Sequence, residues 1–221
     1  NLKNVWTKKT ITDKRPVIAI LDTGVDTEHP DLAANIWTNE REANGAESAD
    51  DDANGFKDDL HGWDFVNQTA RIGDWNGHGT HVAGIAAAVG NNGVGITGAN
   101  PDALIMPVTV MQSDGTGDVA TIIKGIDYAA ANGADVISMS LGGYSYSMAE
   151  EQALGKAYAT AVIVAAAGND GTSVDTSPIF PAAFQFVLGV QATESPSGDL
   201  AKFSNSDSDP IYTTHSAETE L

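Results

Sequence analysis

The sequence predicts an α/β protein in which a parallel β-sheet has helices on both of its faces. The first observation is a series of short, largely apolar runs, at residues 17–21, 103–110, 135–140, 162–167 and 186–190. Continuous apolar runs are typical of strands that are buried on both faces. The second observation is that helix-like stretches lie between these runs, at residues 79–89, 118–132 and 147–160. Strands that alternate with helices favour parallel pairing.

The composition indicates one globular domain and excludes several classes of protein. The 221 residues, 42% of them hydrophobic, are enough to bury a sizeable core. The absence of cysteine excludes a disulfide scaffold and a thiol nucleophile. A net charge of −19 argues against nucleic acid as a partner and is compatible with divalent cations. No apolar run reaches the length that spans a membrane, so we expect no membrane partner.

The chain divides into a short arm and one domain. Residues 1–15 are polar and basic, as expected of a surface arm, and residues 16–221 form the domain. The run at 17–21 ends at Asp22, which places this carboxylate at the carboxyl end of a strand, where open α/β sheets carry their active sites. The last stretch, residues 204–221, is polar and without periodicity, so we interpret it as a connection that ends before the next strand.

His78 is the main candidate for a catalytic base. It lies between two glycines, which let the backbone turn sharply and leave the imidazole uncrowded. Good helix formers follow, so His78 is predicted to be the first residue of a helix. A near-neutral pKa makes histidine the usual general base. A lone histidine here would have a structural role, but three further segments fit the same chemistry.

Four motifs together resemble the subtilisin-like serine proteases. Residues 78–84, His-Gly-Thr-His-Val-Ala-Gly, are similar to the histidine motif of that family, and residues 20–26, Ile-Leu-Asp-Thr-Gly-Val-Asp, to its aspartate motif. Residues 167–171 resemble the segment of the oxyanion-hole asparagine, and residues 140–143 resemble the substrate-binding strand. The order of aspartate before histidine is that of the family. The resemblance covers residues 16–206 and implies the three-layer α/β/α fold of a peptidase.

The resemblance implies three catalytic residues in this chain. Asp22 would orient His78, His78 would act as the general base, and Asn169 would stabilise the oxyanion. No Gly-Thr-Ser-Met-like nucleophile segment occurs, and Ser140, Ser173 and Ser204 lack that context. The sequence therefore predicts a serine endopeptidase domain that is incomplete on its C-terminal side, with the nucleophile beyond residue 221. The 221-residue chain alone is expected to be inactive.

The substrate groove is also assigned by resemblance. Glycines after residue 140 would leave backbone groups open for an extended peptide. Apolar and small residues would form the walls of the groove and of the primary specificity pocket. The predicted substrate-binding residues are Ser140, Leu141, Gly142, Val119, Ile122, Ala166, Ala167 and Gly168. For Val119 and Ile122, an ordinary helix start remains an alternative. The resemblance also places a cis proline at Pro181.

The most acidic stretch, residues 50–59, predicts a calcium loop. Oxygen ligands recur at the spacing of the first part of an EF-hand loop, with Gly55 at the turn. The predicted ligands are Asp50, Asp52, Asn54, the carbonyl of Phe56 and Asp58. His61 replaces the glutamate expected at position twelve and no helix precedes the loop, so we expect a calcium loop in a surface insertion. A solvated acidic loop is the alternative.

A second calcium site is implied by resemblance alone. Residues 29–32, His-Pro-Asp-Leu, match the family segment whose aspartate binds calcium. The ligands would be Asp31, Asn92 and the carbonyls of Val89, Val94 and Ile96. The alternative is an ordinary Asn-Gly turn. Calcium that binds only the folded state would stabilise both loops.

The expected partners follow from the peptidase interpretation. They are polypeptide substrates and the protein's own propeptide, and the protein is expected to be a secreted monomer. The competing interpretation is a catalytically inactive, calcium-stabilised peptide-binding module of the same fold. An aspartic protease is disfavoured because it needs two Asp-Thr-Gly segments. A nucleotide-binding domain is disfavoured because no Gly-x-Gly-x-x-Gly follows the first strand.

Overall fold

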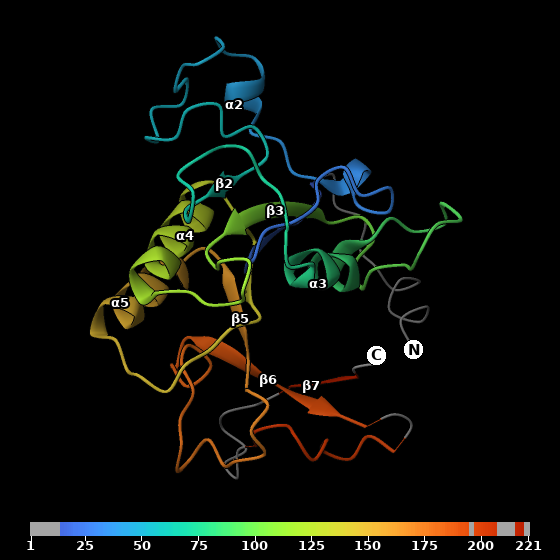
Figure 1. The fold of residues 1–221 in the computed structure, drawn as a ribbon, viewed down its shortest axis with the longest axis vertical. Helices are drawn as coiled ribbons and strands as arrows, with labels where there is room; N and C mark the ends of the chain where they lie inside the picture. Colours follow the sequence, from blue (N-terminus) through green and yellow to red (C-terminus); the bar gives the residue numbers. More distant parts are fainter. Residues whose placement is uncertain (1–13, 195–196, 207–214, 219–221) are drawn as a thin grey trace.

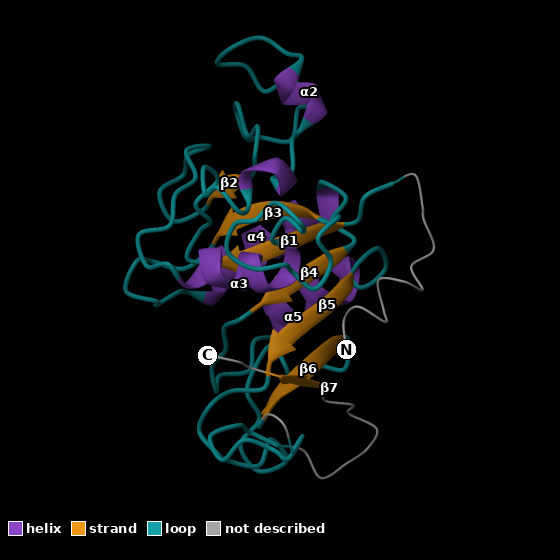
Figure 2. Cartoon of the chain, turned by 90° about the vertical axis from the view of Figure 1, so that its right-hand side faces the viewer, coloured by secondary structure: helices purple, strands orange, loops and turns teal. Residues whose placement is uncertain are grey.

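The structure is a computed structural model that describes residues 14–194, 197–206 and 215–218. Its strands are β1 (Val17–Asp22), β2 (Trp63–Asp64), β3 (Leu104–Thr109), β4 (Val136–Met139), β5 (Val162–Ala166), β6 (Val187–Thr193) and β7 (His215–Glu218). They form one sheet in the order β2-β3-β1-β4-β5-β6-β7, and each neighbouring pair runs parallel (Figures 1 and 2). The parallel sheet predicted from the sequence is confirmed.

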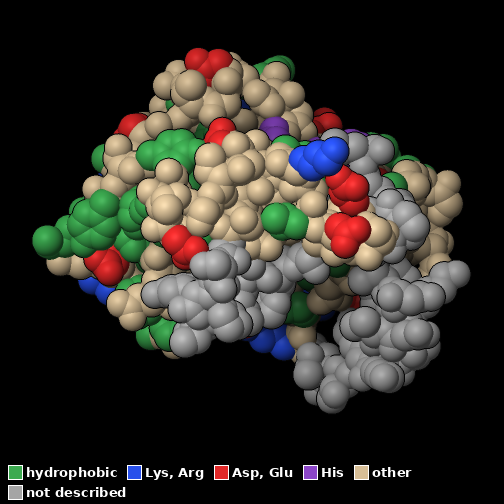
Figure 3. Space-filling view, turned by 90° about the horizontal axis from the view of Figure 1, so that it is seen from below, with side chains coloured by type: hydrophobic (Ala, Val, Ile, Leu, Met, Phe, Trp, Pro, Cys, Tyr) green, Lys and Arg blue, Asp and Glu red, His purple; other side chains and the backbone are tan. Residues whose placement is uncertain are grey.

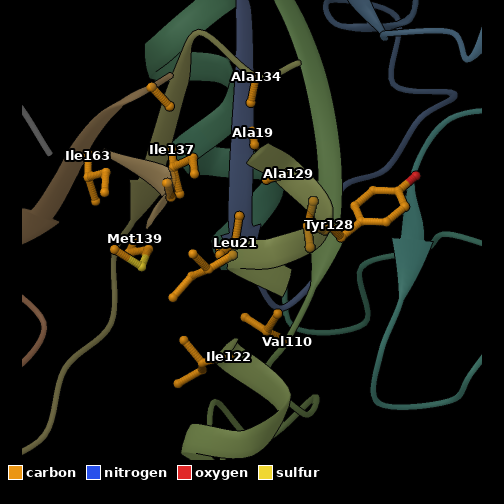
Figure 4. Close-up of a cluster of buried hydrophobic side chains, with 14 of the residues drawn as sticks. Ala19, Leu21, Val110, Ile122, Tyr128, Ala129, Ala134, Ile137, Met139 and Ile163 are labelled. Carbon is orange, nitrogen blue, oxygen red and sulfur yellow. The ribbon is translucent and has the colours of Figure 1, made fainter. Parts of the chain in front are cut away.

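Helices cover both faces of this sheet. The helical segments are η1 (Ala33–Asn35), α2 (Glu40–Ala43), α3 (His78–Ala87), α4 (Val119–Ala131) and α5 (Met148–Ala157). Ile18 and Ile20 of β1 belong to a cluster with the alanines of α3. Ala19 and Leu21, which point the other way, pack in a larger cluster with α4 and α5 (Figure 4). The alternation along β1 therefore places it between two helical layers.

The larger cluster forms the main core. Figure 4 shows Leu21, Ile122, Ile137, Met139 and Ile163 converging between the sheet and α4. Each fully buried aliphatic side chain of this kind contributes about 1.5–3 kcal/mol of transfer free energy. This core fixes β1, β3 and β4 next to one another, so that the residues after these strands share one edge of the sheet.

The face of the sheet that α3 covers is only partly buried beyond β1. Ile20, Ser138, Val164 and Leu188 are in register across β1, β4, β5 and β6, and therefore point to the same side. Ile20 is fully buried, Ser138 and Val164 are half-buried, and Leu188 is 37% exposed. On the opposite side, the neighbouring row is buried at Ala19, Ile137 and Ile163. Parallel sheets normally have both faces covered, so this row of side chains is incompletely covered by the described residues.

One part of the structure differs from the expectation. The stretch interpreted as a connection contains β7, which pairs with β6 at the end of the strand order. An edge strand is held by backbone hydrogen bonds and needs no apolar pattern, which explains why the sequence did not indicate it.

The arm of residues 1–15 lies outside the described residues except for Lys14 and Arg15. No helix among the described residues has the length and apolarity to span a membrane. The predicted cis bond precedes Pro181.

Candidate active site

Asp22 and His78 lie in contact at the carboxyl end of β1. Nδ1 of His78 is 2.7 Å from Oδ1 of Asp22, which also accepts a 2.7 Å hydrogen bond from the Thr23 N–H. The Asp22 side chain is fully buried, whereas 45% of the His78 side chain is exposed. Because a carboxylate only accepts hydrogen bonds, Nδ1 of neutral His78 carries the proton and Nε2 is the basic nitrogen. The exposed imidazole can therefore take a proton from a group in solvent.

Close backbone contact holds the start of α3 against the end of β1. A Cβ on Gly79 would lie 2.1 Å from the Gly24 carbonyl oxygen, so only glycine fits at this position. Gly77 precedes the helix with a φ of 95°, a left-handed conformation that favours glycine. The two glycines on either side of His78 therefore have separate structural functions, one in the turn and one in the contact with the strand.

Asp74 connects the two halves of this contact and was not recognised in the sequence. Its carboxylate accepts hydrogen bonds from the N–H groups of Gly77 and Thr80 and from the hydroxyls of Thr80 and Thr23. Thr23 in turn accepts from the Gly79 N–H. Burial alone would raise the pKa of Asp74, but the hydrogen bonds from Thr80, Gly77 and Thr23 outweigh it and lower that pKa. Asp74 caps α3 from outside the helix, a contact that no local motif indicates.

Asn169 lies on an exposed turn after β5. This turn is held by Asn205, a completely buried residue that was also not recognised in the sequence. Its Oδ1 accepts from the N–H groups of Asp170 and Thr172, and its own N–H donates to the Gly168 carbonyl. Asn205 is 36 positions away along the chain, so sequence spacing alone could not associate it with the turn. The arrangement fixes the backbone from which the Asn169 amide projects.

The predicted groove residues lie after β4, after β5 and at the start of α4. Ser140 and Leu141 are half-buried and Gly142 is exposed. The opposite segment, Ala166 to Gly168, continues β5, which is the neighbour of β4 in the sheet. Val119 and Ile122 belong to the first turn of α4, where Ile122 is buried in the main core. The strand order therefore places the two backbone walls side by side.

A polar cavity lies on the β3 side of Asp22 and includes the next residue, Thr23, in its lining. It has a volume of about 250 Å³ and is lined by Thr23, Asp64, Val66, Asn67, Gly73, Trp75, Thr109, Met111, Gln112 and Ser113. The buried Thr109 hydroxyl has no hydrogen-bond partner. The Trp75 side chain is 83% exposed. The cavity and the groove thus lie on opposite sides of Asp22 in the strand order.

The acidic loop brings together a carboxylate cluster that differs from the predicted ligand set. Glu42, Asp52 and Asp59 have carboxylate oxygens within 4.8 Å of one another. Of these, only Asp52 belongs to the predicted set. The amides of Asn39 and Asn54 each donate to both Asp52 and Asp59. The carboxylate oxygens of this cluster, and the side-chain carbonyl oxygens of Asn39 and Asn54, are of the kind that binds calcium in proteins.

The environment of Asp59 is unfavourable for an isolated carboxylate. Its side chain is fully buried, and burial raises its pKa despite a 2.6 Å hydrogen bond from the Tyr128 hydroxyl. The predicted ligands Asp50 and Asp58 instead accept backbone N–H groups, from Asn54 and Gly55 and from Ser48 respectively. The EF-hand spacing did not predict Glu42, which lies on α2 before the acidic stretch. It also did not predict Asp59, which directly follows the last predicted ligand, Asp58.

The residues of the second predicted metal site are neighbours. Asp31 Oδ1 accepts a 2.7 Å hydrogen bond from the Asn92 amide, and Oδ2 accepts one of 2.9 Å from the Ile96 N–H. The Val89 N–H donates to the Asp31 carbonyl, and the Val94 N–H donates to the Asn92 side chain. The hydrogen bonds from Asn92 and Ile96 lower the pKa of Asp31. A negative charge is therefore held inside the loop that follows α3.

Comparison with known proteins gives matches over most of the chain. A sequence model described as the Subtilase family matches residues 13–218. The chain is 41% identical over 178 residues to Thermitase of Thermoactinomyces vulgaris, covering 80% of this chain and 54% of that protein. It is 38% identical over 180 residues to Subtilisin DY of Bacillus licheniformis, covering 80% of this chain and 56% of that protein. A Thermophilic serine proteinase of Bacillus sp. strain AK1 is 38% identical to this chain over 189 residues, which are 85% of this chain and 40% of that protein. The chain spans about half the length of these relatives.

Proposed function

Because this chain belongs to the subtilase family, we propose that it carries the aspartate, histidine and oxyanion-binding residues of a serine endopeptidase. The observation that supports this most directly is the 2.7 Å contact between Nδ1 of His78 and the buried Asp22 carboxylate. We further propose that residues 16–221 belong to one peptidase domain. Its substrates are polypeptides, and it functions in secreted form, as the names of relatives such as the Minor extracellular protease Epr indicate for them.

In the proposed mechanism, His78 transfers protons, Asp22 supports His78, and Asn169 stabilises the oxyanion. His78 takes the proton of the nucleophile at Nε2, and later gives it to the leaving amine. Asp22 holds the required tautomer and stabilises the imidazolium. The Asn169 amide donates to the oxyanion, and loss of one such donor costs about 2.7–4 kcal/mol, a magnitude that comes from a member of this same family.

The nucleophile is proposed to be a serine outside residues 1–221. Two serines considered above have other partners, since Ser204 Oγ donates to the Asn205 carbonyl and Ser173 Oγ to Asp175. The incompletely covered row of Ser138, Val164 and Leu188 supports the proposal, because a helix packed there would lie on the same face as α3. Such a helix could present a serine at its first turn to His78.

Calcium is the proposed structural cofactor, and it has no part in the proton transfers. Glu42, Asp52 and Asp59 would hold one ion, since a cation offsets the repulsion between three carboxylates within 4.8 Å. Asp31 with Asn92 and the carbonyls of Val89, Val94 and Ile96 would hold a second. Ions that bind only the folded state would stabilise α2 and the loop after α3.

Fluorophosphonate labelling followed by intact mass tests the proposal. The probe reacts with an activated serine, so the natural protein that contains this sequence should acquire one adduct on a species heavier than 22.9 kDa. The His78→Ala variant of that protein should not be labelled. A folded, unlabelled protein that still binds peptides would instead indicate the inactive peptide-binding module.

A further inference from the structure

We propose that Ile179 restricts the primary specificity pocket, so that the substrates carry a small side chain such as alanine on the acyl side of the cleaved bond. This inference rests on the proposed peptidase function and specifies the substrate class of the same groove. It follows from the atoms that occupy the space between the two backbone walls.

Ile179 lies against both of these walls. A Cβ on Gly142, in the first wall, would lie 2.9 Å from both Cδ1 and Cγ1 of Ile179. A Cβ on Gly168, in the second wall, would lie 2.9 Å from the same Cδ1 atom. One branched side chain is therefore packed against both glycines. A substrate side chain that entered between the walls would meet Ile179.

The position of Ile179 is fixed by the segment that carries it. The next residue, Phe180, forms a two-way backbone pair with Gly143, with N–H to carbonyl distances of 2.8 Å in both directions. The Phe180 ring packs against Phe184 and Tyr146, with ring centroids 4.7 Å and 5.7 Å away. Ile179 itself is 7% exposed. The pairing and the ring packing fix the backbone that carries Ile179, and the burial of its side chain leaves it little room to rotate.

A second contact joins the two walls on the outside. The Tyr144 hydroxyl, just after the first wall, donates a hydrogen bond to the Asp170 carboxylate, just after the second. The Asp170 N–H is held by buried Asn205. This bridge links the ends of the two walls and therefore favours the spacing between them that the structure shows.

Pocket size discriminates between side chains through steric fit. A difference of one methylene group in an apolar pocket changes the preference by about 10–200-fold. We therefore expect a phenyl ring to be disfavoured relative to a methyl group by at least about ten-fold. Removing the branches of Ile179 should restore room for the larger group.

Peptide binding to the 221-residue chain tests this without requiring hydrolysis. Fluorescent tetrapeptide amides that differ only in the last residue, Ala, Val, Leu or Phe, are titrated and followed by fluorescence anisotropy. The wild-type chain should bind the Ala peptide at least about ten-fold more tightly than the Phe peptide. The Ile179→Val, Ile179→Ala and Ile179→Gly variants should progressively reduce or reverse this ratio.

Ile179→Leu conserves the side-chain volume and serves as the matched control, which should keep the wild-type ratio. Circular dichroism melting identifies any variant that fails to fold, and the Val and Ala variants keep the series interpretable if Gly is unstable. Two results would overturn the inference about Ile179 but not the proposed peptidase function. One is equal affinity of the wild-type chain for the Ala and Phe peptides, and the other is an affinity ratio that stays the same in all the Ile179 variants. A folded wild-type chain that binds none of the peptides would contradict the proposed groove itself.

Discussion

Asp22 is the residue whose environment is most specialised. Its carboxylate is fully buried, yet Oδ2 has no hydrogen-bond partner among the described residues, while Oδ1 accepts from Thr23 and contacts His78. A buried carboxylate without full hydrogen bonding is unfavourable for stability. Such an arrangement is expected where a buried carboxylate orients an imidazole and stabilises the positive charge that the imidazole acquires during a reaction.

The Asp22→Asn variant should keep the fold and lose activity. An amide in this position favours the wrong tautomer of His78, and the corresponding change in serine proteases lowers kcat by about 10⁴-fold. Peptide hydrolysis by the natural protein that supplies the nucleophile measures this loss. Asp127→Asn, on the exposed side of α4, is the control and should hydrolyse at the wild-type rate. Near wild-type activity of Asp22→Asn would exclude its proposed function.

Asp74 should make a contribution to stability that depends on pH. Hydrogen bonds outweigh burial and hold its pKa below the ordinary value of about 3.9. A lowered folded-state pKa stabilises the fold above the unfolded-state pKa, and this contribution is lost as the pH falls through the folded-state pKa. At neutral pH, the free energy of unfolding should therefore be larger for the wild type than for Asp74→Asn. The difference should shrink below about pH 4 in urea titrations, and a difference that grows on acidification would contradict the hydrogen-bond assignment.

Among the elements, α3 has the strictest packing at its first turn. A Cβ at Gly79 would come within 2.1 Å of the Gly24 carbonyl, whereas one at Gly84 would only meet Ile96 Cδ1, at 3.9 Å. The two glycines belong to one helix but have different surroundings. The same substitution by alanine at these two positions therefore distinguishes the effect of helix propensity from the effect of packing against β1.

Gly79→Ala and Gly84→Ala should have opposite effects on stability. At Gly84, alanine removes backbone freedom from the unfolded chain and should stabilise the helix by up to about 1 kcal/mol. At Gly79, the added methyl group should cost about 1–3 kcal/mol and displace His78 from Asp22. Chemical denaturation measures both, and a His78 imidazole NMR signal that stays unchanged in Gly79→Ala would argue against the displacement.

The loop that contains α2 provides a test of which carboxylates bind calcium. The carboxylate cluster predicts that calcium raises the melting temperature and that Glu42→Gln or Asp59→Asn abolishes this increase. The EF-hand spacing instead assigns the effect to Asp50 and Asp58, so Asp50→Asn and Asp58→Asn are the discriminating controls. Calorimetric titration of the chelated protein gives the affinities. An unchanged melting temperature after chelation would remove calcium from both proposed sites.

At the scale of the whole molecule, the two faces of the sheet are unequally covered. The row that contains Ile137 and Ile163 is buried by α4 and α5, while the opposite row becomes more exposed from Ser138 to Leu188. Figure 3 shows hydrophobic side chains reaching the surface on the side seen from below Figure 1. A further helix on this row would bury apolar area that the described residues leave accessible.

The 221-residue chain should therefore bind a hydrophobic dye such as ANS while folded. Leu188→Ser should reduce the dye fluorescence with little loss of stability, since Leu188 is 37% exposed. Ile163→Ser, at 1% exposure in the same pair of strands, should strongly destabilise the chain. Dye fluorescence that is equally low in the chain and in the natural protein containing the nucleophile helix would contradict the proposed packing.

The sequence alone determined those features that depend on local pattern. The apolar run before Asp22 specified β1, and the glycines around His78 specified a turn into α3, because side-chain periodicity and backbone freedom act over a few residues. The family motifs also indicated Asp22, His78 and Asn169. Only the tertiary structure brought in Asp74, Asn205 and Glu42. These contacts join residues far apart along the chain, and they depend on strand order and the meeting of loops, which no local pattern encodes.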